Sequence, residues 1–439
     1  MNISILAAGA GGMYCGSCMR DSAMATALKR QGHDVTLIPL YTPLRDEHPD
    51  AAHPEVFYGG INVYLQHASR LFRHTPRMLD WIFDRPWMLN VAGKMGAQTS
   101  PKKLAGLTQS ILEGQEGAAS KELDRLVQFL RHTIKPQVIS LPNLMFIGMA
   151  RTFKEALGIP VICEMTGEDI FLDAMDGPDR QRIRQIIQSR AADANRLVAT
   201  SQYYASHMAG YLEMPVEQIE VVPNGISSEY LTPLKDQKEK PSAAPTVGYL
   251  ARICPEKGLA QFIEAMKILL TFPDLQNAKF KVAGYLGKRD EKWIADLRRQ
   301  VAAEGLSDRF EFLGEVDLSA KLNMLDSLDV FTVPTVYPEA KGIYVLEAMA
   351  RGIPVVQPAH GSFPELIEQT QGGLLVPPNN PHALAETIAG FLRDPARRQT
   401  MGRAGRAAVE SSFTEDHMAR NMMNVFNDVL QSNAGMVRA

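Results

Sequence analysis

Short apolar runs alternate with longer amphipathic stretches along most of this chain. Near-continuous apolar runs of this length are typical of strands in a parallel sheet that helices cover on both faces. Helical periodicity between the runs predicts repeated βα units, and therefore an α/β protein with two Rossmann-like, doubly wound domains. The predicted strands lie at residues 2–8, 35–40, 138–141, 161–164, 196–200, 219–222, 246–251, 280–284, 310–313, 330–334, 355–357 and 374–376.

Two segments interrupt this alternation. Lysines, prolines and small residues at 232–245 indicate a linker, which divides the chain into an N-terminal domain at 1–235 and a C-terminal domain at 236–413. Residues 67–120 mix aromatics and leucines with basic residues and predict a helical insertion in the first domain. Ligands of doubly wound sheets bind at the carboxyl ends of the strands, so we expect the site in the cleft between the domains.

Composition changes this picture little but narrows the class of protein. The chain has 439 residues, 45% of them hydrophobic, and a formal net charge of −3. This charge gives no global field for nucleic acid, and none is expected as a partner. Four cysteines are too few for a disulfide framework, and no apolar run reaches the ~18 residues of a membrane span. The expected location is the cytoplasm.

The turn after strand 246–251 carries two cations. Arg252 opens this turn, and Lys257 and Gly258 precede a helix predicted at 259–270. The free amides of a helix start favour anions, arginine can hold a diphosphate bidentately, and lysine adds a mobile charge. The turn therefore predicts an anion site, with an ordinary pair of surface charges as the alternative.

Two carboxylates follow strand 330–334. Glu339 lies in the loop, and Glu347 lies one turn into a helix that begins near Ile343. A carboxylate suits vicinal hydroxyls because each oxygen accepts from one of them, as acidic residues do for ribose in other nucleotide folds. The alternative is that Glu339 caps the helix and Glu347 is a solvated surface residue.

A glycine-rich turn follows the first strand but does not fit a dinucleotide fingerprint. Tyr14 stands where the third glycine would be, and strand 35–40 lacks the acidic residue that holds the ribose of NAD. Cys15 and Cys18 form a Cys-x2-Cys pair, but no second pair completes a zinc site. No metal and no cofactor are therefore expected.

Three further segments accompany the Arg252-x4-Lys257-Gly258 turn and the Glu339-x7-Glu347 pair. They are Val221-Val222-Pro223-Asn224-Gly225-Ile226, Gly361-Ser362-Phe363-Pro364-Glu365-Leu366 and Gly372-Gly373-Leu374-Leu375-Val376-Pro377-Pro378. In their order along the chain, these five motifs resemble the retaining, GT-B-fold glycosyltransferases of family 4 type, the glycosyl transferases group 1. The resemblance covers nearly the whole chain and implies the GT-B fold, with a final helix at 414–439 that crosses back to the N-terminal domain.

The resemblance also implies a role for each residue of the anion site. Arg252 and Lys257 would neutralise the leaving diphosphate of a nucleotide-sugar, and these fixed cations would replace a metal. Glu347 would hold the ribose hydroxyls, and Glu339 would contact the donor sugar. The activity implied is retaining transfer of a hexose from a nucleoside diphosphate sugar to an acceptor.

Three backbone positions complete the expected donor site. The amides of Gly342 and Ile343 would lie near phosphate or sugar oxygens. The family's Gly-Gly pair aligns, counted back from Gly32, with Cys15-Gly16, so Gly16 is the glycine expected to approach the donor.

The acceptor side departs from the family pattern. Relatives often carry a histidine at the end of strand 138–141 and a His-Gly after strand 161–164, and neither histidine is present here. Nearby polar residues could replace them on the acceptor or sugar side, with capping as the alternative role for Thr166 or Asp169. These residues are Asn143, Thr166, Glu168 and Asp169.

The missing histidines leave open a nucleotide-sugar-binding protein without turnover. A nucleotide-sugar epimerase of the same fold is the other alternative, although the Arg-x4-Lys and Glu-x7-Glu combination argues against it. The acceptor itself, whether a small molecule, a glycan or a lipid-linked molecule, is not readable. The tryptophans and arginines of 67–120 would suit peripheral membrane contact, with an extra helical layer on the first domain as the alternative.

Overall fold

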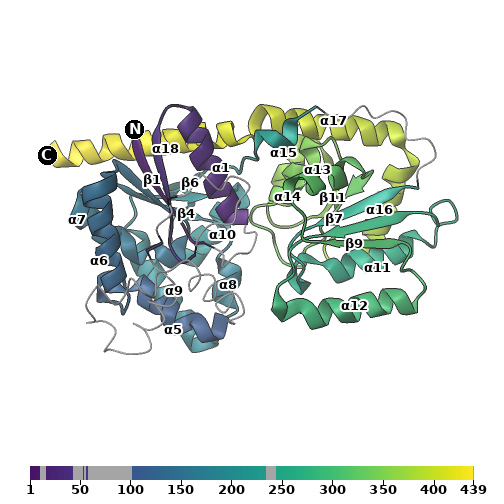
Figure 1. Cartoon of the computed structure of the whole chain (residues 1–439), viewed down its shortest axis with the longest axis horizontal. Coiled ribbons are helices and arrows are strands. Elements are labelled where there is room, and N and C mark those ends of the chain that lie inside the picture. The colour runs from purple at the N-terminus through teal and green to yellow at the C-terminus, as the bar shows by residue number, and fades with distance from the viewer. Residues whose placement is uncertain (10–15, 43–52, 54–55, 58–100, 234–243, 439) are drawn as a thin grey trace. The chain divides into compact units, whose positions relative to one another are not determined.

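The computed structural model describes residues 1–9, 16–42, 53, 56–57, 101–233 and 244–438. These residues form two compact units. The first joins Met1–Asn224 to Glu415–Ala439, and the second is Gly225–Thr414. Each unit is a parallel sheet with helices on both faces, so the predicted pair of Rossmann-like α/β domains is confirmed (Figure 1).

The sheet of the first unit has the strand order β2-β1-β3-β4-β5-β6, with all described pairs parallel. The order reverses between β1 and β3, which places the topological switch point of this sheet there. The strands are β1 (Asn2–Ala7), β2 (Asp34–Pro39), β3 (Val138–Leu141), β4 (Val161–Met165), β5 (Arg196–Ala199) and β6 (Ile219–Val221).

Eight labelled helices accompany this sheet within the described residues. The first begins at Gly16, and most of the helical insertion that we predicted at 67–120 lies outside the described residues. The helices are α1 (Gly16–Arg30), α5 (Pro101–Leu112), α6 (Ser120–Phe129), α7 (Gly148–Leu157), α8 (Asp169–Asp173), α9 (Gly177–Ala191), α10 (Gln202–Leu212) and α18 (Glu415–Arg438).

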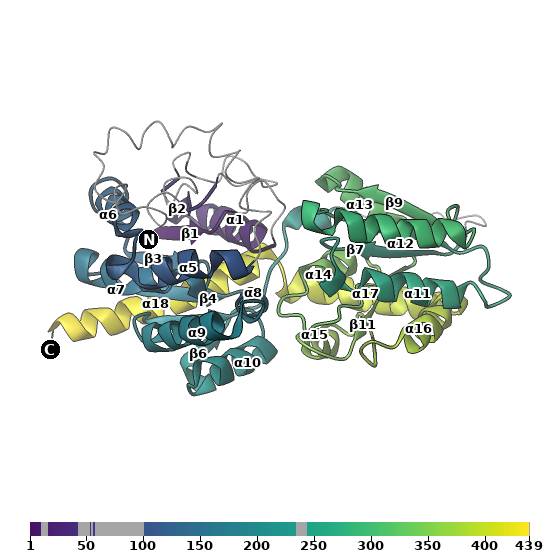
Figure 2. The same cartoon turned by 90° about the horizontal axis from the view of Figure 1, so that it is seen from below.

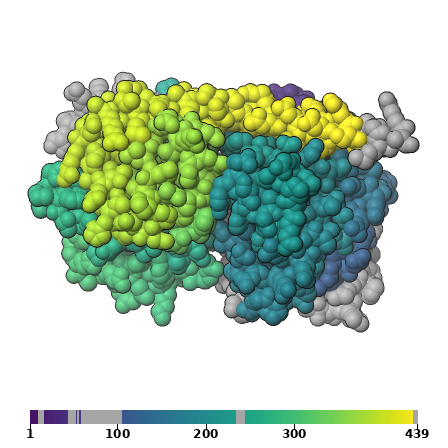
Figure 3. Space-filling model, turned by 180° about the vertical axis from the view of Figure 1, so that it is seen from behind, coloured from purple at the N-terminus to yellow at the C-terminus, as the bar shows by residue number. Residues whose placement is uncertain are grey.

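Helix α18 packs on the sheet of the first unit although it comes last in the chain. Its residues Met418, Met422 and Phe426, spaced four apart, are buried in one cluster with Ile3 of β1 and Leu28 of α1. Figure 1 shows α18 beside α1, and in Figure 3 the yellow C-terminal residues form a ridge along this unit.

The sheet of the second unit has the order β12-β11-β10-β7-β8-β9, which is the doubly wound order of a dinucleotide-binding fold. Its switch point lies between β7 and β10, where Phe331 pairs with Gly248. The strands are β7 (Thr246–Leu250), β8 (Lys279–Ala283), β9 (Phe310–Gly314), β10 (Val330–Phe331), β11 (Val355–Pro358) and β12 (Gly373–Val376).

Helices cover both faces of the second sheet. Figure 1 shows α11 and α12 on one face and α14 and α17 on the other. This division follows from the strand order, because the connections on the two sides of a switch point leave toward opposite faces. The helices are α11 (Leu259–Leu269), α12 (Glu291–Ala303), α13 (Leu318–Asp326), α14 (Ile343–Ala350), α15 (Phe363–Thr370), α16 (Pro381–Arg393) and α17 (Pro395–Ser412).

Candidate active site

The turn after β7 and the loop after β10 meet at the switch point of the second sheet. The amide of Val336 donates to the carbonyl of Glu256, with 3.1 Å between nitrogen and oxygen. Gly258 has φ 73°, and a Cβ built on it would overlap the carbonyl oxygen of Pro334. Only glycine fits both the left-handed backbone and this close approach. Gly258 thereby holds Lys257 against the loop that carries Glu339.

Lys257 and Glu339 form an ion pair across the two segments. Glu339 also accepts from the hydroxyl of Tyr344 at 2.8 Å and from that of Tyr337 at 3.2 Å. Lys257 Nζ lies about 5 Å above both tyrosine rings, 5.1 and 5.2 Å from their centroids. The structure therefore surrounds the lysine with one carboxylate and two aromatic faces.

The Glu339 carboxylate is buried and ionised. Burial is the largest single influence and raises the pKa of this carboxyl, but the charge and hydrogen bond of Lys257, with the bonds from Tyr344 and Lys341, together lower the pKa to about 2. An ionised carboxylate is only an acceptor, so a ligand must bring hydroxyls or amides to it. The amide of Lys341 already donates to Glu339 Oε1 at 3.2 Å. This bond lies before the helix start, and Glu339 is therefore not the cap of α14.

Arg252 is exposed at the start of the same turn. Its Nε donates to the sulfur of Cys254 at 3.4 Å. Cys254 is buried, and burial raises the pKa of its thiol. Of the two cations in the predicted anion site, Lys257 is already neutralised by Glu339.

Glu347 is buried rather than solvated, with 5% of the residue exposed. Its Oε1 accepts from the hydroxyl of Tyr230 at 2.8 Å and from Lys321 Nζ at 3.2 Å. Lys321 Nζ also donates to the Tyr230 oxygen at 2.6 Å. Neither partner of Glu347 was predicted from the sequence. Lys321 belongs to no motif and has the pattern of an ordinary polar residue of α13, and Tyr230 lies beside the predicted linker.

The start of α14 has the form that we expected for an anion-binding helix end. Gly342 is its N-cap with φ 61°, and no side chain caps the helix. The amide of Ile343 lies in the first turn, directed out of the helix start. The chain before it is fixed from outside, because the Ser362 amide donates to the Glu339 carbonyl at 2.7 Å.

On the first unit, Gly16 is exposed at the first position of α1. The preceding turn at 10–15, including Cys15, lies outside the described residues. Cys18 is buried within α1. Among the residues that the structure describes, no group of three or more acidic, histidine or cysteine side chains could hold a metal ion. Within the same residues, no helix is long and apolar enough to cross a membrane.

Three of the expected acceptor-side residues make hydrogen bonds within the first unit. Asn143 accepts from the amide of Met145 at 3.0 Å and so caps a short helical turn. Glu168 is buried and accepts from the amides of Leu144 at 3.0 Å and Thr166 at 2.7 Å. Burial raises the pKa of Glu168. These bonds tie the loop after β3 to the loop after β4.

Asp169 differs because it has a partner that reaches solvent. It accepts from the hydroxyl of Tyr204 at 2.7 Å, and its other oxygen lies 3.2 Å from His207 Nε2. The side chains are 15% exposed for Asp169 and 37% for His207. The hydrogen bond that His207 donates to Asp169 raises the pKa of His207. Sequence reasoning missed His207, because it lies in α10, outside every motif.

A buried ion pair joins α1 to β4 in the first unit. Arg20 of α1 pairs with Glu164 of β4, and its Nε donates to Asn224 Oδ1 at 2.9 Å. Ser140, which stands near the position of the family's missing histidine, donates to Glu164 Oε1 at 2.8 Å. This network links α1, β3 and β4 to Asn224, the last residue before the chain enters the second unit.

Both parts of the chain match family models of glycosyltransferases. Residues 22–225 match the model of the glycosyl transferase 4-like domain, and residues 232–408 match that of the glycosyl transferases group 1. The chain is 28% identical over 293 residues to a GDP-mannose-dependent mannosyltransferase of Corynebacterium glutamicum that acts on a monoacylated phosphatidylinositol monomannoside, covering 63% of this chain and 72% of the relative. It is 31% identical to a phosphatidyl-myo-inositol mannosyltransferase of Mycobacterium leprae, over 48% of this chain and 54% of that one.

Solved structures share the fold over nearly the full length. Sucrose-phosphate synthase of Thermosynechococcus elongatus superposes with a TM-score of 0.70 at 18% identity, covering 98% of this chain and 99% of that one. The Anabaena protein HepE, solved with UDP and glucose, gives a TM-score of 0.67 at 17% identity, covering 97% and 99%. At this level of identity the likeness concerns the fold alone.

Proposed function

Because the chain belongs to the glycosyl transferases group 1 and is a GT-B glycosyltransferase of the hexosyltransferase type, we propose that its donor is a nucleoside diphosphate hexose. The single observation that carries this proposal is the Lys257–Glu339 pair at the switch point of the second sheet. It sets a cation and an ionised acceptor side by side where doubly wound folds bind nucleotides.

The proposed chemistry follows from these charges. As the bond between sugar and diphosphate breaks, negative charge grows on the leaving phosphate oxygens, and Arg252 and Lys257 stabilise it. Lys257 turns from Glu339 toward the diphosphate, which frees an acceptor for the donor sugar's hydroxyls. The amides of Gly342 and Ile343 add neutral donors at the same helix start. These groups supply the charge compensation without a metal, and we propose transfer with retention of the anomeric configuration.

Glu347 is the proposed ribose contact. Its Oε1 is fixed by Tyr230 and Lys321, so the carboxylate has a set orientation before a ligand arrives. A carboxylate held in this way can accept from a ribose hydroxyl without first losing side-chain freedom. Lys321 and Tyr230 are positioning residues in this scheme.

The Asp169–His207 pair is the proposed acceptor contact. Asn143, Thr166 and Glu168 are buried and tie loops together, whereas His207 is more than one-third exposed. A His207→Gln variant should raise KM for the acceptor and leave the Kd of the nucleoside diphosphate unchanged. Unchanged acceptor kinetics would remove this pair from the acceptor side.

The donor proposal is tested by thermal shift with UDP, GDP and ADP, followed by incubation with the matching nucleotide-hexoses. A ligand at 100 times its Kd stabilises the fold by about 2.7 kcal/mol, so the correct base is recognised by the largest rise in Tm. Hydrolysis of the donor or transfer of its sugar supports the proposal. Saturable binding without product, or an epimerised donor, would support the two alternative functions instead.

A further inference from the structure

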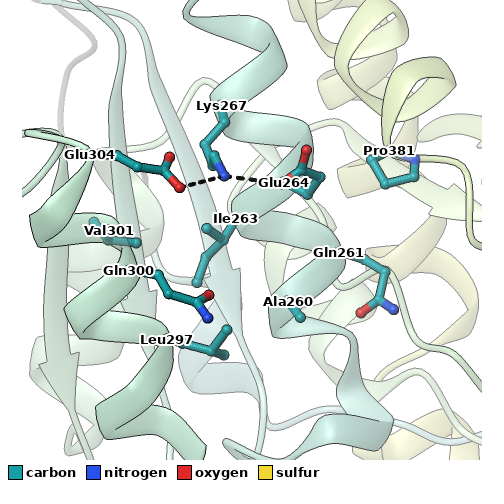
Figure 4. Close-up of a pocket in the computed structure, with 10 residues that line it drawn as sticks. All are labelled: Ala260, Gln261, Ile263, Glu264, Lys267, Leu297, Gln300, Val301, Glu304 and Pro381. Atoms are coloured by element: carbon teal, nitrogen blue, oxygen red, sulfur yellow. Dashed lines mark hydrogen bonds and ion pairs between the residues drawn. The ribbon is translucent and has the colours of Figure 1, made fainter.

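A groove of about 320 Å³ lies between α11 and α12 of the second unit, with Pro381 of α16 at its border. Figure 4 shows the residues that line it, and Figures 1 and 2 show the two helices beside each other. Its volume is at the small end of the range of roughly 300–1,000 Å³ for small-molecule sites. None of the residues that we assign to the donor or acceptor lines it.

Two amide side chains line the groove. Gln261 comes from the first turn of α11, and Gln300 comes from α12. The Oε1 atom of Gln261 is buried and accepts no hydrogen bond. A buried acceptor without a partner destabilises a fold, and Gln261 is only partly buried, so a rotation of its side chain would turn this oxygen into the groove, where a ligand can donate to it. A hydroxyl group is such a donor and can also accept from an amide nitrogen.

The charges of the groove select against an anion. Lys267 Nζ lies 2.8 Å from a carboxylate oxygen of Glu304 and 3.2 Å from one of Glu264 (Figure 4). One lysine between two carboxylates leaves a net negative charge. A phosphate or a nucleotide would be repelled here, and the lysine occupies the place of a metal ion between the carboxylates. The groove therefore suits a neutral, hydroxyl-rich ligand.

The remaining lining is apolar. Ile263 of α11 and Leu297 and Val301 of α12 contribute aliphatic surface, and Ala260 leaves space because its side chain is short. An apolar patch with amides and carboxylates around it matches a sugar ring, which has C–H faces and a rim of hydroxyls.

We propose that this groove is a second carbohydrate site, which binds a neutral oligosaccharide outside the donor site. The inference goes beyond the proposed function and does not depend on it, because oligosaccharide binding here requires neither donor nor turnover. The groove begins at Ala260, two residues after Gly258, so a bound chain lies on the same helix that follows the Lys257 turn.

The test measures binding of mannotriose and maltotriose to the full chain without nucleotide, by saturation-transfer NMR and calorimetric titration. Glucose 6-phosphate serves as the anionic comparison. We expect at least one neutral trisaccharide to bind saturably and glucose 6-phosphate not to bind. The groove proposal is overturned if neither trisaccharide binds saturably, or if the anion binds as tightly as the sugars.

Gln261→Leu provides a sharper readout, because binding and stability should change in opposite directions. The leucine removes the unpaired buried oxygen, so Tm should stay equal or rise, while the Kd of the trisaccharide should rise at least about tenfold. Gln276→Leu is the matched control, since Gln276 is exposed outside the groove and should bind the sugar like the wild type. Unchanged affinity in Gln261→Leu, or an equal loss in the control, would overturn the proposal.

Ala260→Leu fills the groove and should weaken trisaccharide binding to a similar extent. Lys257→Ala separates this site from the donor site, because Lys257 does not line the groove. We expect the trisaccharide to bind Lys257→Ala with wild-type affinity. Loss of binding in that variant would mean that the sugar occupies the donor site, and the groove would then have no assigned ligand.

Discussion

Lys321 Nζ lies 3.2 Å from Glu347 Oε1, and both side chains are buried although they come from different helices, α13 and α14. A buried carboxylate needs such a cation, since removal of one partner leaves the other charged and desolvated. The pair therefore ties the proposed ribose contact to a helix that no motif includes.

Lys321→Met should raise the Kd of the nucleoside diphosphate about tenfold and lower Tm, because Glu347 loses the cation that orients it. Tyr230→Phe removes one hydrogen bond and should have a smaller effect in the same direction. The Kd of the nucleoside diphosphate is measured for both variants by calorimetric titration. Lys281→Met is the control and should bind the nucleoside diphosphate like the wild type, because Lys281 bonds to Ser327 and lies near Glu311, neither of which we assign to the donor site.

Glu347→Ala distinguishes a ribose contact from a general loss of affinity. The wild type should prefer the ribonucleoside diphosphate over its 2′- or 3′-deoxy analogue, and this preference should disappear in Glu347→Ala. The four Kd values form a double-mutant cycle. A preference that survives the substitution would show that another group reads the ribose.

The Lys257–Glu339 pair predicts a defined dependence of stability on pH. The pKa of Glu339 is about 2 in the fold, against 4.5 for the free side chain. A depressed pKa contributes stability that is fully present above the unfolded value and is lost as pH falls toward the folded one. The advantage in Tm of the wild type over Glu339→Gln should therefore be constant above about pH 5 and shrink toward pH 2.

Lys257→Ala should lower kcat at least tenfold, because the leaving diphosphate loses a stabilising charge. The fold should survive with a lower Tm, since Glu339 keeps its bonds from Tyr344, Tyr337 and Lys341. Steady-state kinetics with the donor found by thermal shift measure this change. An unaltered kcat would refute the leaving-group role.

Gly258→Ala should damage both stability and donor binding, because its Cβ would overlap the Pro334 carbonyl and displace the turn that holds Lys257. Gly305→Ala is the matched control. Gly305 has φ 72°, almost the value of 73° at Gly258, but no atom lies within 4 Å of its built Cβ. Any loss in Gly258→Ala beyond that of Gly305→Ala is therefore steric, and equal losses would mean that backbone strain alone acts.

The strands and the turns that carry the motifs could be predicted from the sequence, because both depend on residues that are close together in the chain. The strands 138–141 and 355–357 were placed within one residue of β3 and β11, and Ile343 was identified as the start of α14. The residues that form ion pairs with charged residues of these segments could not be predicted. Lys321 and Glu347 are 26 residues apart, and Arg20 and Glu164 are 144 apart, so each pairing depends on how the sheets assemble.

The roles of the acceptor-side residues could not be predicted either, because they also depend on the tertiary structure. Asn143, Thr166 and Glu168 have the side chains of catalytic or binding residues, but burial and backbone amides give them structural bonds. A sequence does not show which side chains are buried, so it does not separate a structural role from a role in binding. In the structure, the burial of Glu168 indicates a structural role, whereas the exposure of His207 allows contact with a ligand.

Helix α18 also bears on how the protein is made. The first unit is discontinuous, since Gly225–Thr414 is inserted between its sheet and its last helix. A nascent chain leaves the ribosome from its N-terminus, so the surface around Ile3 and Leu28 stays without its cover until Met418–Val429 has been synthesised. All residues of the second unit are synthesised before this helix. A chain stalled or cut before residue 415 would therefore expose apolar surface on its N-terminal half, where chaperones and proteases act.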